Sequence, residues 1–251
     1  MIGLLTLAVV SFSSPARSAT FAIGGDTSLN CVIKMTGLIE SGDAAKLRRF
    51  LDKIDSSPTE NINGINLDQV EDDGERVRIC LDSPGGSLSE AVKLADVLLT
   101  NKSTSWQLYL GTAIAANERC ESACAIFFLA GGDYGVLAGP VHFEGGIGRI
   151  ADRVLHAKGK LGFHSIALNL PERAYSSAEV SKAFKLALLS MGAVAERLKP
   201  LRMRVSLFQK MLSTPPDQMY YVETIGDAAH WNIQIAGLPR ISQFSPANVR
   251  E

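Results

Sequence analysis

Hydrophobic and polar positions follow two periods along the chain, and the two alternate from segment to segment. Apolar or alternating stretches predict strands at residues 31–35, 77–81 and 106–110. Helical spacing of apolar residues follows the first two of these strands, at residues 43–54 and 88–99. Strand, turn and helix therefore recur, which is typical of an α/β fold with right-handed crossovers and a mainly parallel sheet.

The second half of the chain continues this alternation around one irregular segment. Residues 123–130 are apolar on all sides and precede two glycines, as expected of a short buried helix with a glycine C-cap. Residues 135–160 are rich in glycine, and we expect an inserted loop or hairpin there. The remaining pattern predicts a short strand at residues 161–164 and a helix over residues 176–212 that Pro200 breaks in two. An extended piece at residues 219–222 and a last small helix at residues 224–231 follow.

Length and composition indicate a globular protein with ample material for a core. The 251 residues suit one large domain, and we expect a single domain over residues 19–251. Hydrophobic residues make up 46% of the chain and charged residues 20%, which excludes a disordered or fibrous protein. The net charge is −1 and no basic face is evident, so nucleic acid is not an expected partner.

The first residues have the pattern of an export signal. Residues 2–12 form an uncharged apolar run, too short to span a bilayer, and small residues follow it. With Ala16 and Ser18 at positions −3 and −1, cleavage after Ser18 would remove a signal peptide of residues 1–18. The usual basic segment is missing, so a buried N-terminal strand is the alternative. We expect an exported protein, periplasmic or extracellular, without a stable membrane anchor in its mature form.

Four cysteines are consistent with an oxidising compartment. Cys31, Cys80, Cys120 and Cys124 allow three pairings, and the sequence does not select among them. A structural zinc site usually draws on Cys-x-x-Cys pairs, whereas two of these cysteines are four apart and the others are isolated in apolar strands. Structural disulfides or buried thiols are the better interpretation, and we expect neither a metal nor another cofactor.

Three features point to acyl-transfer chemistry. Ser122 directly precedes the buried helix of residues 123–130, where free N–H groups and the helix dipole favour an alkoxide or a bound oxyanion; the alternative is that Ser122 is only an N-cap. Gly85 and Gly86 follow a strand, so the backbone there can approach a substrate carbonyl and donate an N–H. His164 follows a short apolar strand and is a candidate general base. The competing histidines are His142, His156 and His230.

Three segments together resemble the Clp-protease/crotonase superfamily. They are residues 78–87 (RICLDSPGGS), 120–131 (CESACAIFFLAG) and 161–164 (LGFH). Within it, the chain is most similar to exported ClpP-like proteins that carry a Cys-x-Ser-Ala-Cys segment, over residues 30–237. The resemblance implies repeated ββα units and a homo-oligomer, because members commonly form trimers or larger rings.

The resemblance also implies roles for individual residues. Ser122 corresponds to the nucleophile and His164 to the base. The oxyanion donors map to the N–H groups of Gly86, Gly85 and Ala123.

The third member of the family's triad is an Asp near the C-terminus, which corresponds best to Asp217. The other candidates, in order, are Asp227 and Asp133.

The chain departs from the family pattern at three points. The segment between Ser122 and His164 is longer than usual because of residues 135–160, and Ser-Ala replaces the usual Ser-Met at the nucleophile. Cys120 and Cys124 stand two residues before and after the serine, so their oxidation state could set the geometry of this turn, against a static structural role.

These features predict an exported, ATP-independent serine hydrolase. Its substrates would be peptides or unfolded protein segments, cleaved through a Ser122–His164–Asp217 triad. The first alternative is a non-catalytic scaffold or binding protein that kept the fold. The second is a crotonase-type enzyme on acyl-coenzyme A thioesters, which export and a Ser–His pair both disfavour.

Overall fold

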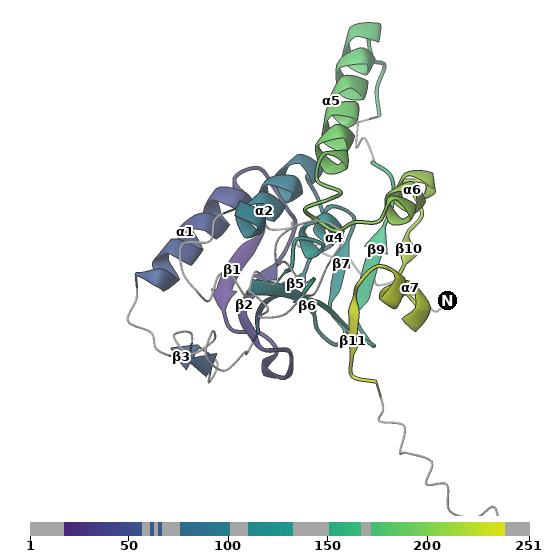
Figure 1. Cartoon of the computed structure of the whole chain (residues 1–251). Helices are drawn as coiled ribbons and strands as arrows, with labels where there is room; N and C mark the ends of the chain where they lie inside the picture. Colours follow the sequence, from purple (N-terminus) through teal and green to yellow (C-terminus); the bar gives the residue numbers. More distant parts are fainter. Residues whose placement is uncertain are drawn as a thin grey trace, which may run out of the picture.

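A six-stranded sheet forms the centre of the protein. The computed structural model describes residues 18–56, 61–62, 65–66, 76–100, 110–132, 151–166 and 172–238. The sheet order is β1-β2-β5-β6-β8-β11, and all neighbours pair in parallel except β1 and β2 (Figure 1). Its strands are β1 (Thr20–Ile23), β2 (Cys31–Thr36), β5 (Val77–Asp82), β6 (Leu110–Ile114), β8 (Arg153–His156) and β11 (Gln234–Ala236). The predicted α/β class with a mainly parallel sheet is confirmed.

Two smaller sheets and a set of helices complete the described fold. A three-stranded sheet has the order β10-β9-β7, and a separate pair joins β3 to β4. These strands are β7 (Arg119–Glu121), β9 (Lys160–Phe163), β10 (Tyr220–Tyr221), β3 (Asn61–Ile62) and β4 (Ile65–Asn66). The helices are η1 (Thr27–Leu29), α1 (Asp43–Asp55), α2 (Leu88–Thr100), α4 (Ala123–Phe128), α5 (Ser177–Ala195), α6 (Val205–Ser213) and α7 (Ile225–His230).

The arrangement of the helices follows their hydrophobic patterns. The helix α4 is apolar on all sides and buried along its whole length, next to α2. The amphipathic helices α1 and α2 lie beside each other against the main sheet and bury one face each (Figure 1). By contrast, α5 projects from the body of the molecule.

The end of the segment expected to be an irregular insertion is a central strand. Residues 153–156 form β8, which pairs with β6 on one side and β11 on the other. This part of the prediction was wrong, because a charged residue at the start of the segment did not indicate a buried strand. Arg153 is buried nonetheless, and its guanidinium donates a hydrogen bond to the carbonyl of Leu201. Residues 133–150 lie outside the described residues.

The first described residues, Ser18 and β1, contact α1 and β2. Residues 1–17 lie outside the described residues, and β1 starts two residues after Ser18. The Ser18 hydroxyl donates to Asp43 at 3.0 Å and accepts from Lys46 at 2.7 Å. The strand β1 is absent from the sequence prediction, and it pairs with β2 at the edge of the sheet.

A buried glutamate joins α1 to α2. The hydroxyl of Ser87 accepts the N–H of Glu90 at 3.3 Å, as its spacing predicts. The Glu90 carboxylate turns away from α2 and accepts the N–H groups of Gly42 and Ala44, each at 3.0 Å, at the start of α1. Burial opposes ionisation, but the Ala44 N–H and the ammonium of Lys93 outweigh it and lower the pKa of Glu90.

We expect Glu90→Gln to lower the free energy of unfolding at about pH 7 by about 1–3 kcal/mol. The reason is that the buried hydrogen bonds from the N–H groups of Gly42 and Ala44 lose their charged acceptor. The folded-state pKa of Glu90 lies below its ordinary value of 4.5, so its contribution is present above that pH and is lost as the pH falls. Urea unfolding at several pH values should show the two proteins converging in acid. A gap that widens in acid would contradict this account.

Candidate active site

Ser122 occupies a strained turn between a strand and a helix. The strand β7 ends at Glu121, α4 begins at Ala123, and Ser122 between them has φ 56° and ψ −124°. A positive φ of this kind is costly for a residue with a side chain and is found mostly at functional sites. Ser122 stands at the N-cap position, yet its hydroxyl makes no capping hydrogen bond. The N-cap interpretation requires such a hydrogen bond, so the Ser122 side chain does not stabilise the helix in that way.

The glycine turn after β5 lies directly against this serine. The backbone of Ser83 pairs with β7, donating its N–H to the Arg119 carbonyl at 2.7 Å and accepting from the Glu121 N–H at 3.1 Å. A Cβ added to Gly85 would lie 2.6 Å from the carbonyl oxygen of Glu121 and 2.7 Å from Cβ of Ser122. Because Gly85 also has φ +100°, only glycine fits there without distortion.

Of the predicted oxyanion donors, two have N–H groups that are free to bind a ligand. Gly85 donates its N–H to the Ser83 hydroxyl at 3.1 Å. Its contribution to the site is therefore to let its backbone lie close to Ser122. Within the described part of the chain, the N–H groups of Gly86 and Ala123 have no acceptor. Both residues line the same cavity as Ser122.

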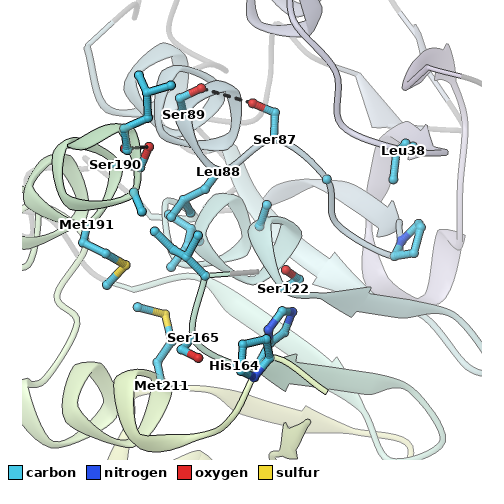
Figure 2. Close-up of a pocket in the computed structure, with 18 residues that line it drawn as sticks. Leu38, Ser87, Leu88, Ser89, Ser122, His164, Ser165, Ser190, Met191 and Met211 are labelled. Atoms are coloured by element: carbon cyan, nitrogen blue, oxygen red, sulfur yellow. Dashed lines mark hydrogen bonds between the residues drawn. The ribbon is translucent and has the colours of Figure 1, made fainter. Parts of the chain in front are cut away.

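His164 reaches the site through the parallel pairing of β9 with β7. Glu121 is in register with Gly162, and the N–H of Ser122 donates to the Gly162 carbonyl at 2.9 Å. Two residues further on, the imidazole of His164 faces the Ser122 side chain (Figure 2). No hydrogen bond joins these two described side chains. The Nδ1 atom of His164 is buried and has no partner in the described structure.

The described carboxylates considered for the third position do not contact His164. Asp217 lies in an exposed turn after α6; its neighbour Pro216 lines the cavity. Ser165 donates its N–H to the Thr214 carbonyl at 2.9 Å, which fixes the start of this turn beside the end of β9.

Asp227 has a structural role at the start of α7. It accepts from the Thr224 hydroxyl at 2.9 Å, and its N–H donates back at 3.0 Å. Burial first, and then the charge of Asp227, raise the pKa of Tyr220 to about 12. Asp133 lies outside the described residues.

The competing histidines lie elsewhere. His156 is on β8, where its Nδ1 accepts the N–H of Lys158 at 3.0 Å. His230 ends α7, with Nε2 3.3 Å from the Ser206 hydroxyl. Neither lines the cavity at Ser122, and His142 is outside the described residues. Among the described histidines, His164 is thus the candidate base at this site.

The cavity at Ser122 has a volume of about 500 Å³, and its wall is polar and apolar in similar measure. Its apolar lining comes from α2, α4, α5 and α6 and includes Leu88, Ile126, Leu186, Met191 and Met211. His164 is the one titratable side chain among its lining residues. Nothing in the motifs indicated that α5 and α6 contribute to this wall.

The four cysteines form two disulfides, Cys31–Cys80 and Cys120–Cys124. The first joins the neighbouring strands β2 and β5, and the second spans Ser122. Among the described residues, no group of three or more His, Cys, Asp or Glu side chains is placed to hold a metal ion. No described helix is long and apolar enough to cross a membrane.

Comparisons with known proteins give similarity of structure only. No family model and no curated protein matches the chain. A point mutant of ClpP1 from Listeria monocytogenes is similar with a TM-score of 0.44 and 13% identity, over 83% of this chain and 91% of that one. A mutant of the 1510-N membrane-bound stomatin-specific protease is similar with a TM-score of 0.43 and 12% identity, over 80% and 76%. The functional assignment below depends on the site geometry.

We expect Gly85→Ala to destabilise the protein by about 1–3 kcal/mol, since the added methyl meets the backbone of Glu121 and the conformation is strained for alanine. Gly192→Ala is the matched control: Gly192 lies in α5 with nothing within 4 Å of an added Cβ. This control should be neutral or slightly stabilising. Thermal unfolding of both variants measures the difference, and equal melting temperatures would refute the close approach at Gly85.

Proposed function

We propose that the protein is an exported, ATP-independent serine hydrolase, and that it acts as a peptidase. The observation that carries the proposal is the Ser122 hydroxyl, which is free of helix capping and faces the imidazole of His164. The N–H groups of Gly86 and Ala123 lie at the same cavity. These groups are the nucleophile, base and oxyanion donors of acyl transfer.

The proposed reaction begins when Ser122 Oγ attacks the carbonyl carbon of the scissile bond and His164 accepts the hydroxyl proton. In this proposal Nε2 of His164 exchanges the proton, and the buried Nδ1 is left for a carboxylate. The negative charge on the carbonyl oxygen is stabilised by the N–H groups of Gly86 and Ala123. His164 then protonates the leaving amine, and water attacks the acyl-enzyme with the same histidine as base.

Asp217 is the proposed partner of His164 Nδ1. The turn that carries it starts at Thr214, whose carbonyl accepts a hydrogen bond from the N–H of Ser165, the residue after His164. In the described structure Asp217 makes no hydrogen bond to the imidazole, so in this proposal the turn moves to complete the triad. A carboxylate there would fix the tautomer and stabilise the imidazolium.

Several observations are consistent with the proposed substrate and location. The cavity of about 500 Å³ is large enough for side chains of a peptide segment. Two disulfides fit an oxidising compartment outside the cytoplasm. An exported protein has no ATP supply, so the proposed activity is independent of nucleotide.

A non-catalytic scaffold is the second candidate function. The missing hydrogen bond between Ser122 and His164, together with the unpaired Nδ1, favours it. In that case the cavity would bind a peptide without cleaving it. A crotonase-type reaction on acyl-coenzyme A thioesters has less support, because that chemistry needs the oxyanion donors and not the Ser–His pair.

We expect a fluorophosphonate probe to label the intact protein at Ser122, because the probe traps a serine that an adjacent base activates. Ser122→Ala should abolish labelling, and His164→Ala should slow it by about 10²–10⁴-fold. Ser165→Ala, which removes another hydroxyl of the same cavity, should leave Ser122 labelled. Gel fluorescence and mass spectrometry of the modified peptide provide the readout. If the wild-type protein is not labelled, the scaffold function is favoured.

We also propose that α5 joins two copies of this chain. Five large apolar side chains are more than half exposed on this projecting helix: Val180, Phe184, Leu186, Leu188 and Leu189. Monomeric proteins in water rarely expose so many apolar side chains together. The end of α5 nearest the body lines the cavity through Ser190 and Met191, so the contact would lie beside the site (Figure 2).

Replacing both Phe184 and Leu188 with Glu should shift the protein to a smaller species, since charge is unfavourable in an apolar interface. Light scattering coupled to size exclusion measures the mass. Gln209→Glu adds a charge on the exposed surface of α6 and should leave the mass unchanged. A wild-type protein that is already a monomer would exclude this role for α5.

A further inference from the structure

The Cys120–Cys124 disulfide encloses the proposed nucleophile. Cys120 is the middle residue of β7 and Cys124 is the second residue of α4, with 5.1 Å between their Cα atoms. The closed ring contains Glu121, Ser122 and Ala123. Both cysteines are fully buried, and the ring therefore holds the nucleophile and one oxyanion donor between two fixed points.

The start of α4 lacks the usual stabilisation of a helix N-terminus. The serine at its N-cap position does not bind the helix N–H groups, and its φ of 56° is unfavourable for a residue with a side chain. The helix has only six residues. If the turn relaxed, the serine hydroxyl would be free to cap α4 and so be withdrawn from the cavity.

The two sides of the turn are held differently. On the strand side, β7 is hydrogen-bonded to the Ser83 backbone and pairs with β9. The Ser122 N–H also donates a hydrogen bond to the Gly162 carbonyl. On the helix side, α4 is held by packing and at its far end by the Thr112 hydroxyl, which donates to the Phe128 carbonyl at 2.7 Å, while its start has no side-chain cap. The disulfide is the covalent link from the first turn of α4 to the fixed strand.

We propose that the Cys120–Cys124 disulfide is a positioning element of the active site that replaces the helix cap. It keeps Ser122 in its unfavourable backbone conformation, so that the hydroxyl stays in the cavity and the Ala123 N–H keeps its direction. This inference rests on the proposed hydrolase function for its catalytic consequence. Its effect on the backbone is independent of that function.

The second disulfide provides a matched control. Cys31–Cys80 joins two adjacent strands of the main sheet, and neither cysteine lines the cavity. It closes a much longer loop, with a sequence separation of 49 against 4, and its removal should cost at least as much stability. A purely structural role for Cys120–Cys124 therefore predicts no greater loss of reactivity than removal of Cys31–Cys80 produces.

The experiment compares the full-length variants C120A/C124A and C31A/C80A by the kinetics of fluorophosphonate labelling at Ser122. We expect the maximal labelling rate of C120A/C124A to fall about tenfold or more with the half-saturating probe concentration little changed, because positioning and not probe binding is lost. The rate for C31A/C80A should stay within about twofold of the wild type. Equal effects in the two variants, or no effect in C120A/C124A, would overturn the proposal.

Hydrogen exchange provides a readout that does not depend on activity. Amides of residues 121–125 should exchange about tenfold or more faster in C120A/C124A, whereas in C31A/C80A they should not. Unchanged exchange there would refute the positioning role even if labelling fell. Faster exchange with an unlabelled wild-type protein would support the effect on the backbone and reject the hydrolase.

If C120A/C124A does not fold, the folded C31A/C80A protein can be treated with a phosphine reductant, which leaves Cys120 and Cys124 as thiols and is verified by thiol counting. The same loss of labelling rate and of amide protection is expected after reduction. Reoxidation should restore both. A reduced protein that labels and exchanges like the oxidised one would contradict the proposal.

Discussion

The contact between Gly85 and Ser122 is the constraint on which the candidate site depends. The turn after β5 and the turn after β7 each connect a strand to a helix, and their backbones lie so close that no side chain fits between them. Hydrogen bonds between Ser83 and β7 hold the two turns in register. Gly86 and Ala123 thereby come to the same cavity, although Gly86 precedes α2 and Ala123 begins α4. A larger residue at position 85 would separate the two donors.

The small sheet brings the third element to these turns. Parallel pairing of β9 with β7 places Gly162 beside Glu121, and His164 follows at the end of β9. From the strand beyond β9, the Tyr221 hydroxyl of β10 donates to the Glu121 carboxylate at 2.9 Å. Burial and this carboxylate raise the pKa of Tyr221, so it stays a donor over the ordinary pH range. The strand that precedes Ser122 is thus hydrogen-bonded to Ser83, to β9 and to Tyr221.

Local pattern predicted most of the fold, and tertiary context decided the rest. The helix after Gly86 and β5 follow from periodicity, whereas the buried helix after Ser122 and β2 follow from apolar stretches closed by glycine. The strand β7 was missed because its three residues have no strand pattern and are ordered by pairing with Ser83 and β9. The strand β8 was missed because it begins with a charged residue, Arg153, whose burial depends on a carbonyl 48 positions away.

The residues of the candidate site divide in the same way, into those that local pattern indicated and those that tertiary packing brought together. Ser122, His164 and the glycines could be singled out because each lies at one end of a predictable element, and their roles stay predictions. The apolar wall from α5 and α6 could not be predicted, because it depends on how separate helices pack around the cavity. The disulfide pairing was equally open from four cysteines, since strand order decides which of them are neighbours.

Two unfavourable features lie at the cavity. A residue with positive φ and no cap, and a buried imidazole nitrogen without a partner, each cost about 1–3 kcal/mol, and both lie at Ser122 and His164. Elsewhere charged groups are well paired: Arg78 forms a two-oxygen contact with the buried Asp152, and Glu90 binds two N–H groups of α1. The Ser122 hydroxyl and the His164 imidazole are held away from partners of this kind, so both remain available to a ligand.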